Sequence, residues 1–129
     1  MPARKQACAP RLTVLSTRAR RFLRRLLLDN NAIGRIQGIA SLAHLQYLSL
    51  SNNQIQSIEG LDSLPIKHLD LANNQIQRLE NLHTLVLLQV LVVSGNQISS
   101  LSGLQNCKAL NVLEAKDNTV GNIHEVSAA

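Results

Sequence analysis

An asparagine recurs along this chain at nearly constant intervals, and each copy closes the same pattern of apolar residues. The pattern is LxxLxLxxNxI, with Ile, Val or Ala in place of some of its apolar residues, and it occurs five times. The asparagines are separated by 22, 21, 22 and 22 residues. A chain that repeats one unit at such a period folds as a solenoid, because a single unit cannot bury its apolar face and stacked neighbours bury it together. These asparagines are Asn31, Asn53, Asn74, Asn96 and Asn118.

The two halves of each repeat have different apolar periods. Before the asparagine, apolar residues alternate with other residues, which is typical of a short β-strand. After it they lie three apart, as in Ile36, Ile39 and Leu42, which favours tight 3₁₀-like turns. We therefore predict an α/β solenoid with a parallel sheet on its concave face and short 3₁₀ or helical segments on its convex face. The predicted repeats are near 21–42, 43–64, 65–85, 86–107 and 108–129.

The asparagine column is predicted to be structural. Each side-chain amide offers both donors and an acceptor, and at the bend after a strand it can pair with backbone groups that the sheet leaves unpaired. The alternative role is a row of metal or substrate ligands. Within this structural ladder, we expect the internal Asn74 to matter more for stability than Asn118 in the last repeat.

These repeats resemble the 22-residue class of leucine-rich repeats, typified by a regulatory subunit of protein phosphatase 1 and by many ciliary and centrosomal proteins. The resemblance covers about residues 21–129. It implies an intracellular scaffold or regulatory subunit that binds a protein partner, with no catalytic activity and no cofactor. It also implies a cytoplasmic location, more narrowly the cytoskeleton, cilium or centrosome. The identity of the partner does not follow from it.

Basic residues are concentrated at the N-terminus. Eight of the thirteen precede Leu26, and the first acid is Asp29. From Leu26 onward there are five basic and eight acidic residues, so this part has a net charge of 5 − 8 = −3. Residues 1–20 are predicted to be a basic leader or a helix that caps the first repeat. An apolar stripe supports the helix, and it consists of Leu12, Leu15, Ala19, Phe22 and Leu26.

The basic leader also leaves two alternatives open. It is similar to a mitochondrial presequence, or it could attach the protein to an acidic membrane or nucleic acid. Nucleic acid is disfavoured, because aromatic residues make up only 2% of the chain and base stacking needs them. A mitochondrially targeted or membrane-associated protein is therefore the second functional hypothesis. No apolar window is long enough to predict a transmembrane helix.

Residues that could support catalysis do not converge in the pattern. The four histidines occupy different positions of the repeat, and only His68, two residues before Asp70, is expected on the concave sheet. Those two could form a His–Asp pair, but no nucleophile accompanies them. Cys8 and Cys107 are far apart and form no CxxC motif, so neither a zinc site nor a disulfide framework is predicted.

The C-terminal end is expected to leave an apolar edge uncapped. Ala115 replaces a large apolar residue, and the chain stops shortly after Val126. Such an edge indicates a truncated product or a piece of a longer protein, or a surface for self-association or a partner. In an isolated chain, we expect Val120, Ile123 and Val126 to be exposed and the last repeat to fray.

Outward-facing strand positions should form columns across the stacked repeats, which gives the concave face its surface. These columns combine one aromatic residue, an apolar island and carboxylates, a mixture that suits a protein helix or peptide. The alternative is a solvated sheet without a partner. The predicted partner-binding residues are Arg25, Tyr47, Ser49, His68, Asp70, Val90, Val92, Val112 and Glu114.

Overall fold

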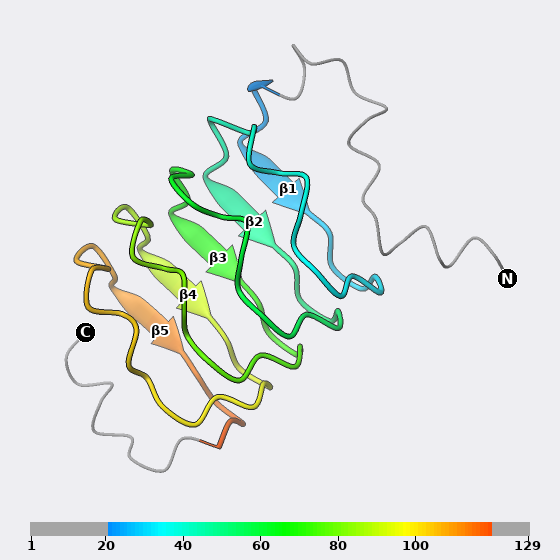
Figure 1. The fold of residues 1–129 in the computed structure, drawn as a ribbon, viewed down its shortest axis with the longest axis vertical. Coiled ribbons are helices and arrows are strands. Elements are labelled where there is room, and N and C mark those ends of the chain that lie inside the picture. Colours follow the sequence, from blue (N-terminus) through cyan, green and yellow to red (C-terminus); the bar gives the residue numbers. More distant parts are fainter. Residues whose placement is uncertain (1–20, 120–129) are drawn as a thin grey trace, which may run out of the picture.

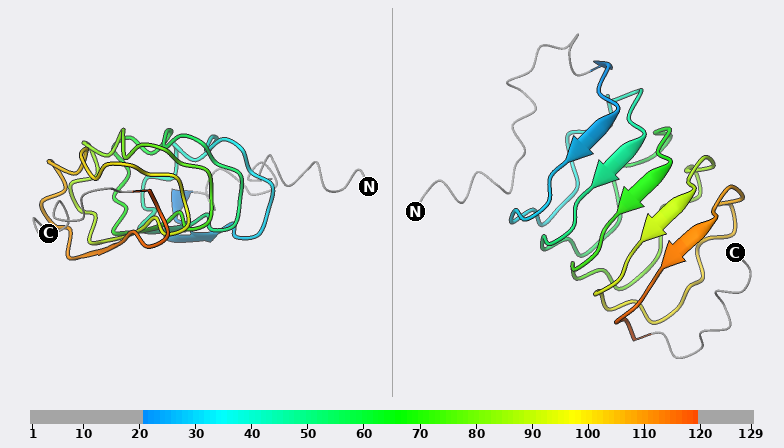
Figure 2. Two further views of the ribbon diagram at one scale, coloured as in Figure 1. Left: turned by 90° about the horizontal axis from the view of Figure 1, so that it is seen from below. Right: turned by 180° about the vertical axis from the view of Figure 1, so that it is seen from behind.

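The structure is a computed structural model, and it describes residues 21–119. The chain forms one parallel sheet whose strands follow one another in sequence order, and each is joined to the next by a return segment that lies on one face of the sheet (Figures 1 and 2). This arrangement confirms the predicted solenoid. The strands are β1 (Arg25–Leu27), β2 (Tyr47–Ser49), β3 (His68–Asp70), β4 (Val90–Val92) and β5 (Val112–Glu114).

The strands are paired so that equivalent residues of successive repeats lie side by side. Leu48 pairs with Leu69, and Leu69 with Leu91, and all three side chains are fully buried. Because side chains alternate along a strand, the residues before and after each of these leucines lie on the opposite, outward face. The first and last residues of the strands thus form the columns that the sequence predicted.

A single aliphatic core runs through the stack. It is built from the middle residue of each strand, the apolar residue after each asparagine and the apolar residues of the return segments. Burial is incomplete at both ends of the described chain, where an end repeat has a described neighbour on one side only. The partly buried core residues are Leu23, Leu26, Leu28, Leu104, Leu110, Leu113 and Ala115.

The return segments correct one part of the prediction. Between residues 28 and 111 the connections are turns and bends, and none contains a helix. The three-residue spacing is satisfied instead by separate turns, in which the amide of Leu42 donates to Ile39 and the amide of Leu45 to Leu42. Bonds that lie three residues apart close single turns, whereas a 3₁₀-helix needs successive ones. The apolar spacing indicated the turns but not whether they merge into a helix.

The spacing between Asn53 and Asn74 is 21 residues, one fewer than between the other asparagines of the ladder. The missing residue lies where the return segment meets β3. Leu85 and Leu88 lie three residues apart and close a turn, whereas the equivalent Leu64 and Ile66 lie only two apart. Pro65 stands between them and has no amide hydrogen to donate. The register of the sheet continues across this shortening without a break.

The asparagine ladder links each repeat to the one before it. Asn74 lies at the bend after β3, where its Oδ1 accepts a hydrogen bond from the amide of Ile55 at 3.0 Å. Its Nδ2 donates to the carbonyls of Leu50 in the preceding repeat and Leu71 in its own. Asn53, Asn96 and Asn118 make the equivalent bonds. Buried backbone groups that would otherwise lack partners are thereby satisfied.

Because these bonds point toward the preceding repeat, the ladder is not symmetric. Asn118 makes the full set, including an acceptor bond from Ile98 at 3.0 Å. Asn31 is exposed, and its bonds in the described chain go only to the carbonyls of Leu28 and Asp29 in its own repeat. Asn31 is therefore the weakest member of the ladder in the described chain, and the expectation that Asn74 matters more than Asn118 stays a prediction.

We predict that Asn74→Ala lowers the free energy of unfolding by about 1–3 kcal/mol, because the buried amide of Ile55 loses its acceptor. Asn31→Ala is the matched control and should cost well under half as much. Urea melts of both variants measure the difference. Equal losses would contradict a ladder directed toward the preceding repeat.

Gly103 and Gly38 allow a second test of the stacking. Both have positive φ angles, of 105° and 81°. A Cβ at Gly103 would lie 1.9 Å from the carbonyl oxygen of Leu79 in the preceding repeat, whereas at Gly38 nothing lies within 4 Å. We predict that Gly103→Ala destabilises the protein by more than about 2 kcal/mol, and Gly38→Ala by only about 1 kcal/mol, the cost of a left-handed alanine. Thermal melts in which the two variants lose equal stability would contradict this close approach.

Candidate functional site: the outward face of the sheet

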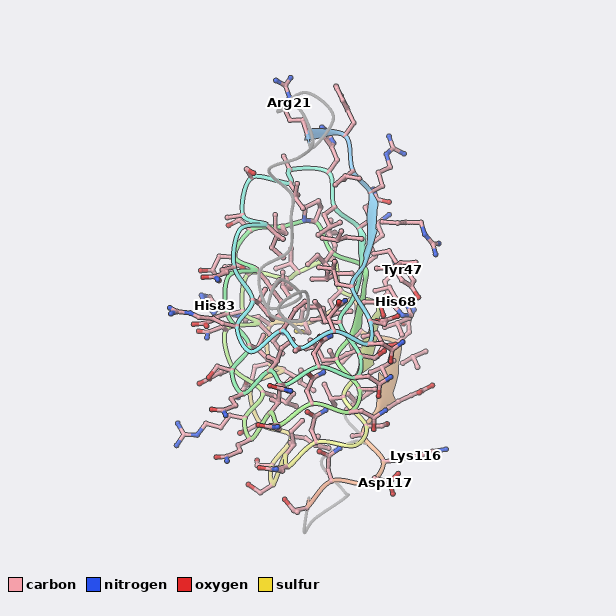
Figure 3. The ribbon with its side chains drawn as sticks, turned by 90° about the vertical axis from the view of Figure 1, so that its right-hand side faces the viewer. Arg21, Tyr47, His68, His83, Lys116 and Asp117 are labelled. Atoms are coloured by element: carbon pink, nitrogen blue, oxygen red, sulfur yellow. The ribbon has the colours of Figure 1, made fainter. Side chains whose placement is uncertain are left out.

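The outward face of the sheet, called the concave face below, carries two complete columns of side chains. Register aligns the first strand residues in one column and the third strand residues in the other. Figure 3 shows Tyr47 and His68 on this side of the molecule and His83 on the opposite side. The columns are Arg25, Tyr47, His68, Val90 and Val112, and Leu27, Ser49, Asp70, Val92 and Glu114.

Three planar groups stack at the N-terminal half of the first column. The guanidinium carbon of Arg25 lies 4.5 Å from the centre of the Tyr47 ring. On its other side, Tyr47 stacks against His68 with ring centres 4.2 Å apart and an interplanar angle of 10°. The cation–π contact is worth about 0.5–1 kcal/mol at an exposed site. The stack brings together three side chains from three successive repeats.

The C-terminal half of the concave face is aliphatic. Val90 and Val92 are half-buried, and Val112 next to Val90 is 42% exposed. Leu27, which the sequence analysis did not include in the site, is 55% exposed at the other end of the second column. Its position in the strand pattern matched that of Val92, so the signal was present in the sequence.

The acids of the predicted site have separate environments. Glu114 is exposed, whereas half-buried Asp70 accepts a hydrogen bond from the amide of Ala72 at 3.0 Å. No described hydrogen bond joins His68 to Asp70, and the histidine ring lies against Tyr47. The His–Asp pair considered from the sequence is therefore absent among the described contacts.

Ser49 lies in the second column but is only 3% exposed. Its hydroxyl donates to the carboxylate of Asp29 at 2.5 Å, and the same carboxylate oxygen accepts from the amide of Ser51 at 2.9 Å. Ser49 therefore supports the joint between the first two repeats and offers a partner almost no surface. Sequence spacing placed it correctly but could not reveal this bond to a neighbouring repeat.

Three other kinds of site are relevant to the described residues: a metal site, a membrane-spanning helix and a reactive thiol. Within residues 21–119 no group of three or more His, Cys, Asp or Glu side chains could hold a metal ion. No helix in the same range could cross a membrane. Cys107 is buried at the edge of the core, 3.7 Å from the carbonyl oxygen of Leu82, and desolvation raises the pKa of its thiol. A protonated, buried thiol is a poor nucleophile.

Several features predicted from the sequence lie outside the described residues. They include Cys8, the leader of residues 1–20 and the apolar residues Val120, Ile123 and Val126. The predicted cap at one end and the predicted open edge at the other both depend on these segments. They stay predictions.

Two segments of the chain, residues 21–63 and 66–106, match a protein family described as "Leucine Rich repeats (2 copies)". No curated protein matches the chain. Among solved structures, two internalins of Listeria monocytogenes are similar in fold. An internalin F has a TM-score of 0.70 at 23% identity over 88% of this chain. An internalin C2 has a TM-score of 0.69 at 31% identity over 77% of it. This chain spans 40% and 45% of their respective lengths.

A third similar structure is the Drosophila melanogaster SNF/U2A' complex. It has a TM-score of 0.67 at 25% identity, and the match covers 88% of this chain and 76% of that one. In this structure U2A' is in a complex with SNF.

We predict that Cys107 in the folded protein reacts much more slowly with a thiol reagent than in the unfolded chain, because burial both shields it and raises its pKa. A Cys8→Ser background isolates its signal, and absorbance at pH 8 follows the reaction with and without urea. Equal rates in the two states would mean that the last described turn does not cover the thiol.

Proposed function

Because the chain belongs to the leucine-rich-repeat family, whose domains generally mediate protein–protein interactions, we propose that it is a protein-binding scaffold or regulatory subunit. In this proposal the partner lies on the concave face. The observation that carries it is the ordered stack of Arg25, Tyr47 and His68 beside an exposed aliphatic surface. Neither half of this surface contributes to the core, so its arrangement is available for binding.

The composition of the face supports recognition of a protein. Interface energy concentrates in a few aromatic, arginine and well-packed apolar residues, and Tyr47, Arg25 and Val92 supply these types. The stack also favours one arrangement of the Tyr47 and Arg25 side chains before a partner arrives. Less side-chain entropy is then lost on binding, which is the usual advantage of a preorganised surface.

Opposite charges at the two ends of the concave face would orient a bound partner across the sheet. Arg25 lies on β1 at one end, and the exposed Glu114 lies on β5 at the other. A helix that crosses the five strands would place acidic groups near Arg25 and basic groups near Glu114. Its apolar stripe would cover Val90, Val92 and Val112. The similar U2A' protein occurs in a complex with SNF, which is in keeping with a partner in the present case.

The proposal also concerns where in the cell the protein acts. We propose a cytoplasmic protein, with the cytoskeleton, cilium or centrosome suggested only by the resemblance to the class that includes the phosphatase 1 subunit. The alternative is a mitochondrial or membrane address in the basic residues 1–20, which lie outside the described residues. Imaging of a tagged chain with and without those residues distinguishes the two.

We predict that the double variant Tyr47→Ala, Val92→Asp weakens partner binding at least about thirtyfold, because one removes an aromatic anchor and the other adds a charge to an apolar contact. Both side chains are only half-buried on the sheet surface, so the variant should fold. Partners are identified by proximity labelling, and affinities are then measured on the purified pair.

The matched control is Arg18→Glu, Arg21→Glu, which changes one arginine of the leader and the arginine that directly follows the leader, and should alter the affinity little. Circular dichroism melts check that both variants are folded. Loss of binding in the arginine variant, with normal binding in the concave-face variant, would move the site to the leader.

A further inference from the structure

The turns that lead into the five strands form one rim of the solenoid (Figure 1), and this rim is apolar. The first residues of the five strands are aligned by the strand register. The residues three positions before them form a corresponding row along the rim, with one member from each repeat. We call this row, with Val86 beside Leu87, the entry rim. It consists of Phe22, His44, Pro65, Val86, Leu87 and Ala109.

Exposure at the entry rim is high for such residues. Phe22 is 58% exposed, Val86 56% and Leu87 46%, and these are three of the five exposed large hydrophobic side chains in the described chain. Phe22 also stacks on His44 of the next repeat, with ring centres 5.9 Å apart. The contact extends the apolar row from the first repeat to the second.

The rim on the other side, after the strands, has the opposite character. Its turns carry exposed amides such as Asn52 and Asn73, and the glutamines Gln56 and Gln75 lie side by side there at 3.4 Å. Turns in this solenoid are therefore not apolar in general. The exposed apolar groups of the entry rim are a specific property of that rim.

Positive charge surrounds the entry rim. Arg21 lies at its N-terminal end, with its guanidinium carbon 5.7 Å from the Phe22 ring, and Lys108 adjoins Ala109 at the other end. Arg24 and Lys67 are the residues directly before β1 and β3, and both are exposed. One acid, Asp62, lies in the turn before β3.

We propose that the entry rim docks on an anionic lipid bilayer. Apolar side chains at the tips of separate turns can enter a fluid interface together, while the basic residues beside them attract acidic headgroups. A rigid protein partner would instead need a surface shaped to match the rim, whereas the tips of separate turns can each insert into a fluid interface. The concave face stays free for the protein partner, because the two surfaces share no side chain.

The test is co-sedimentation of the full chain with phosphatidylcholine vesicles that contain or lack phosphatidylserine. We expect binding only to the anionic vesicles, and a steep loss of binding as salt is raised. Val86→Ser, Leu87→Ser should reduce partitioning on the order of tenfold, since two aliphatic side chains no longer enter the interface. The matched control is Leu27→Ser, Val112→Ser, which removes two similarly exposed side chains from the concave face and should bind normally.

The other outcomes overturn the proposal. Undiminished binding by the rim variant, with loss of binding in Arg18→Glu, Arg20→Glu, would assign the lipid contact to the leader alone. An equal loss in the concave-face control would show unspecific adhesion. Absence of vesicle binding, together with rim-dependent binding to poly-glutamate, would replace the bilayer by an acidic polypeptide. The concave-face double variant changes Tyr47 and Val92, neither of which belongs to the entry rim, so failure of the lipid proposal leaves the result of that variant unaffected.

Discussion

A side-chain amide that reaches back into the preceding repeat links each turn of the solenoid to its neighbour. Each bond from an isoleucine amide to the next asparagine Oδ1 is 3.0–3.1 Å long. The interior around these bonds is aliphatic, and a buried polar group without a partner there costs about 1–3 kcal/mol. Backbone bonds between the same turns, such as that from the amide of Gln75 to the carbonyl of Ile55, act in the same direction. Together these bonds hold equivalent residues of neighbouring repeats side by side, as the in-register sheet and the continuous core require.

The same register arranges the surface. When equivalent residues lie side by side, the chemistry of each repeat position extends into a column, so substitutions at a few positions change a whole face. Arg25, Tyr47 and His68 occupy one such column and can stack only because their strands are aligned. The entry rim arises in the same way three residues earlier in the chain. Two surfaces of different chemistry thus share one scaffold.

Periodicity predicted most of this fold, since strand positions, core residues and columns all depend on residue type at fixed spacing. It failed where a specific partner decides the outcome. Ser49 looks like a surface residue until Asp29 of the neighbouring repeat is placed against it. The direction of the ladder, which makes Asn31 its weakest member, depends on which repeat each amide contacts. The contact of Phe22 with His44 of the next repeat likewise could not be read from spacing, because it joins residues of two repeats.

Amide hydrogen exchange at Ile55 and Ile76 tests the central role of the asparagines most directly. These two amides donate to the side chains of Asn74 and Asn96, so only an intact ladder protects them through a hydrogen bond. A stable ladder predicts that they exchange as slowly as the strand amides of Leu69 and Leu91, by global unfolding. Exchange as fast as that of exposed turn amides, while the strands stay protected, would show that the asparagines do not hold the repeats together.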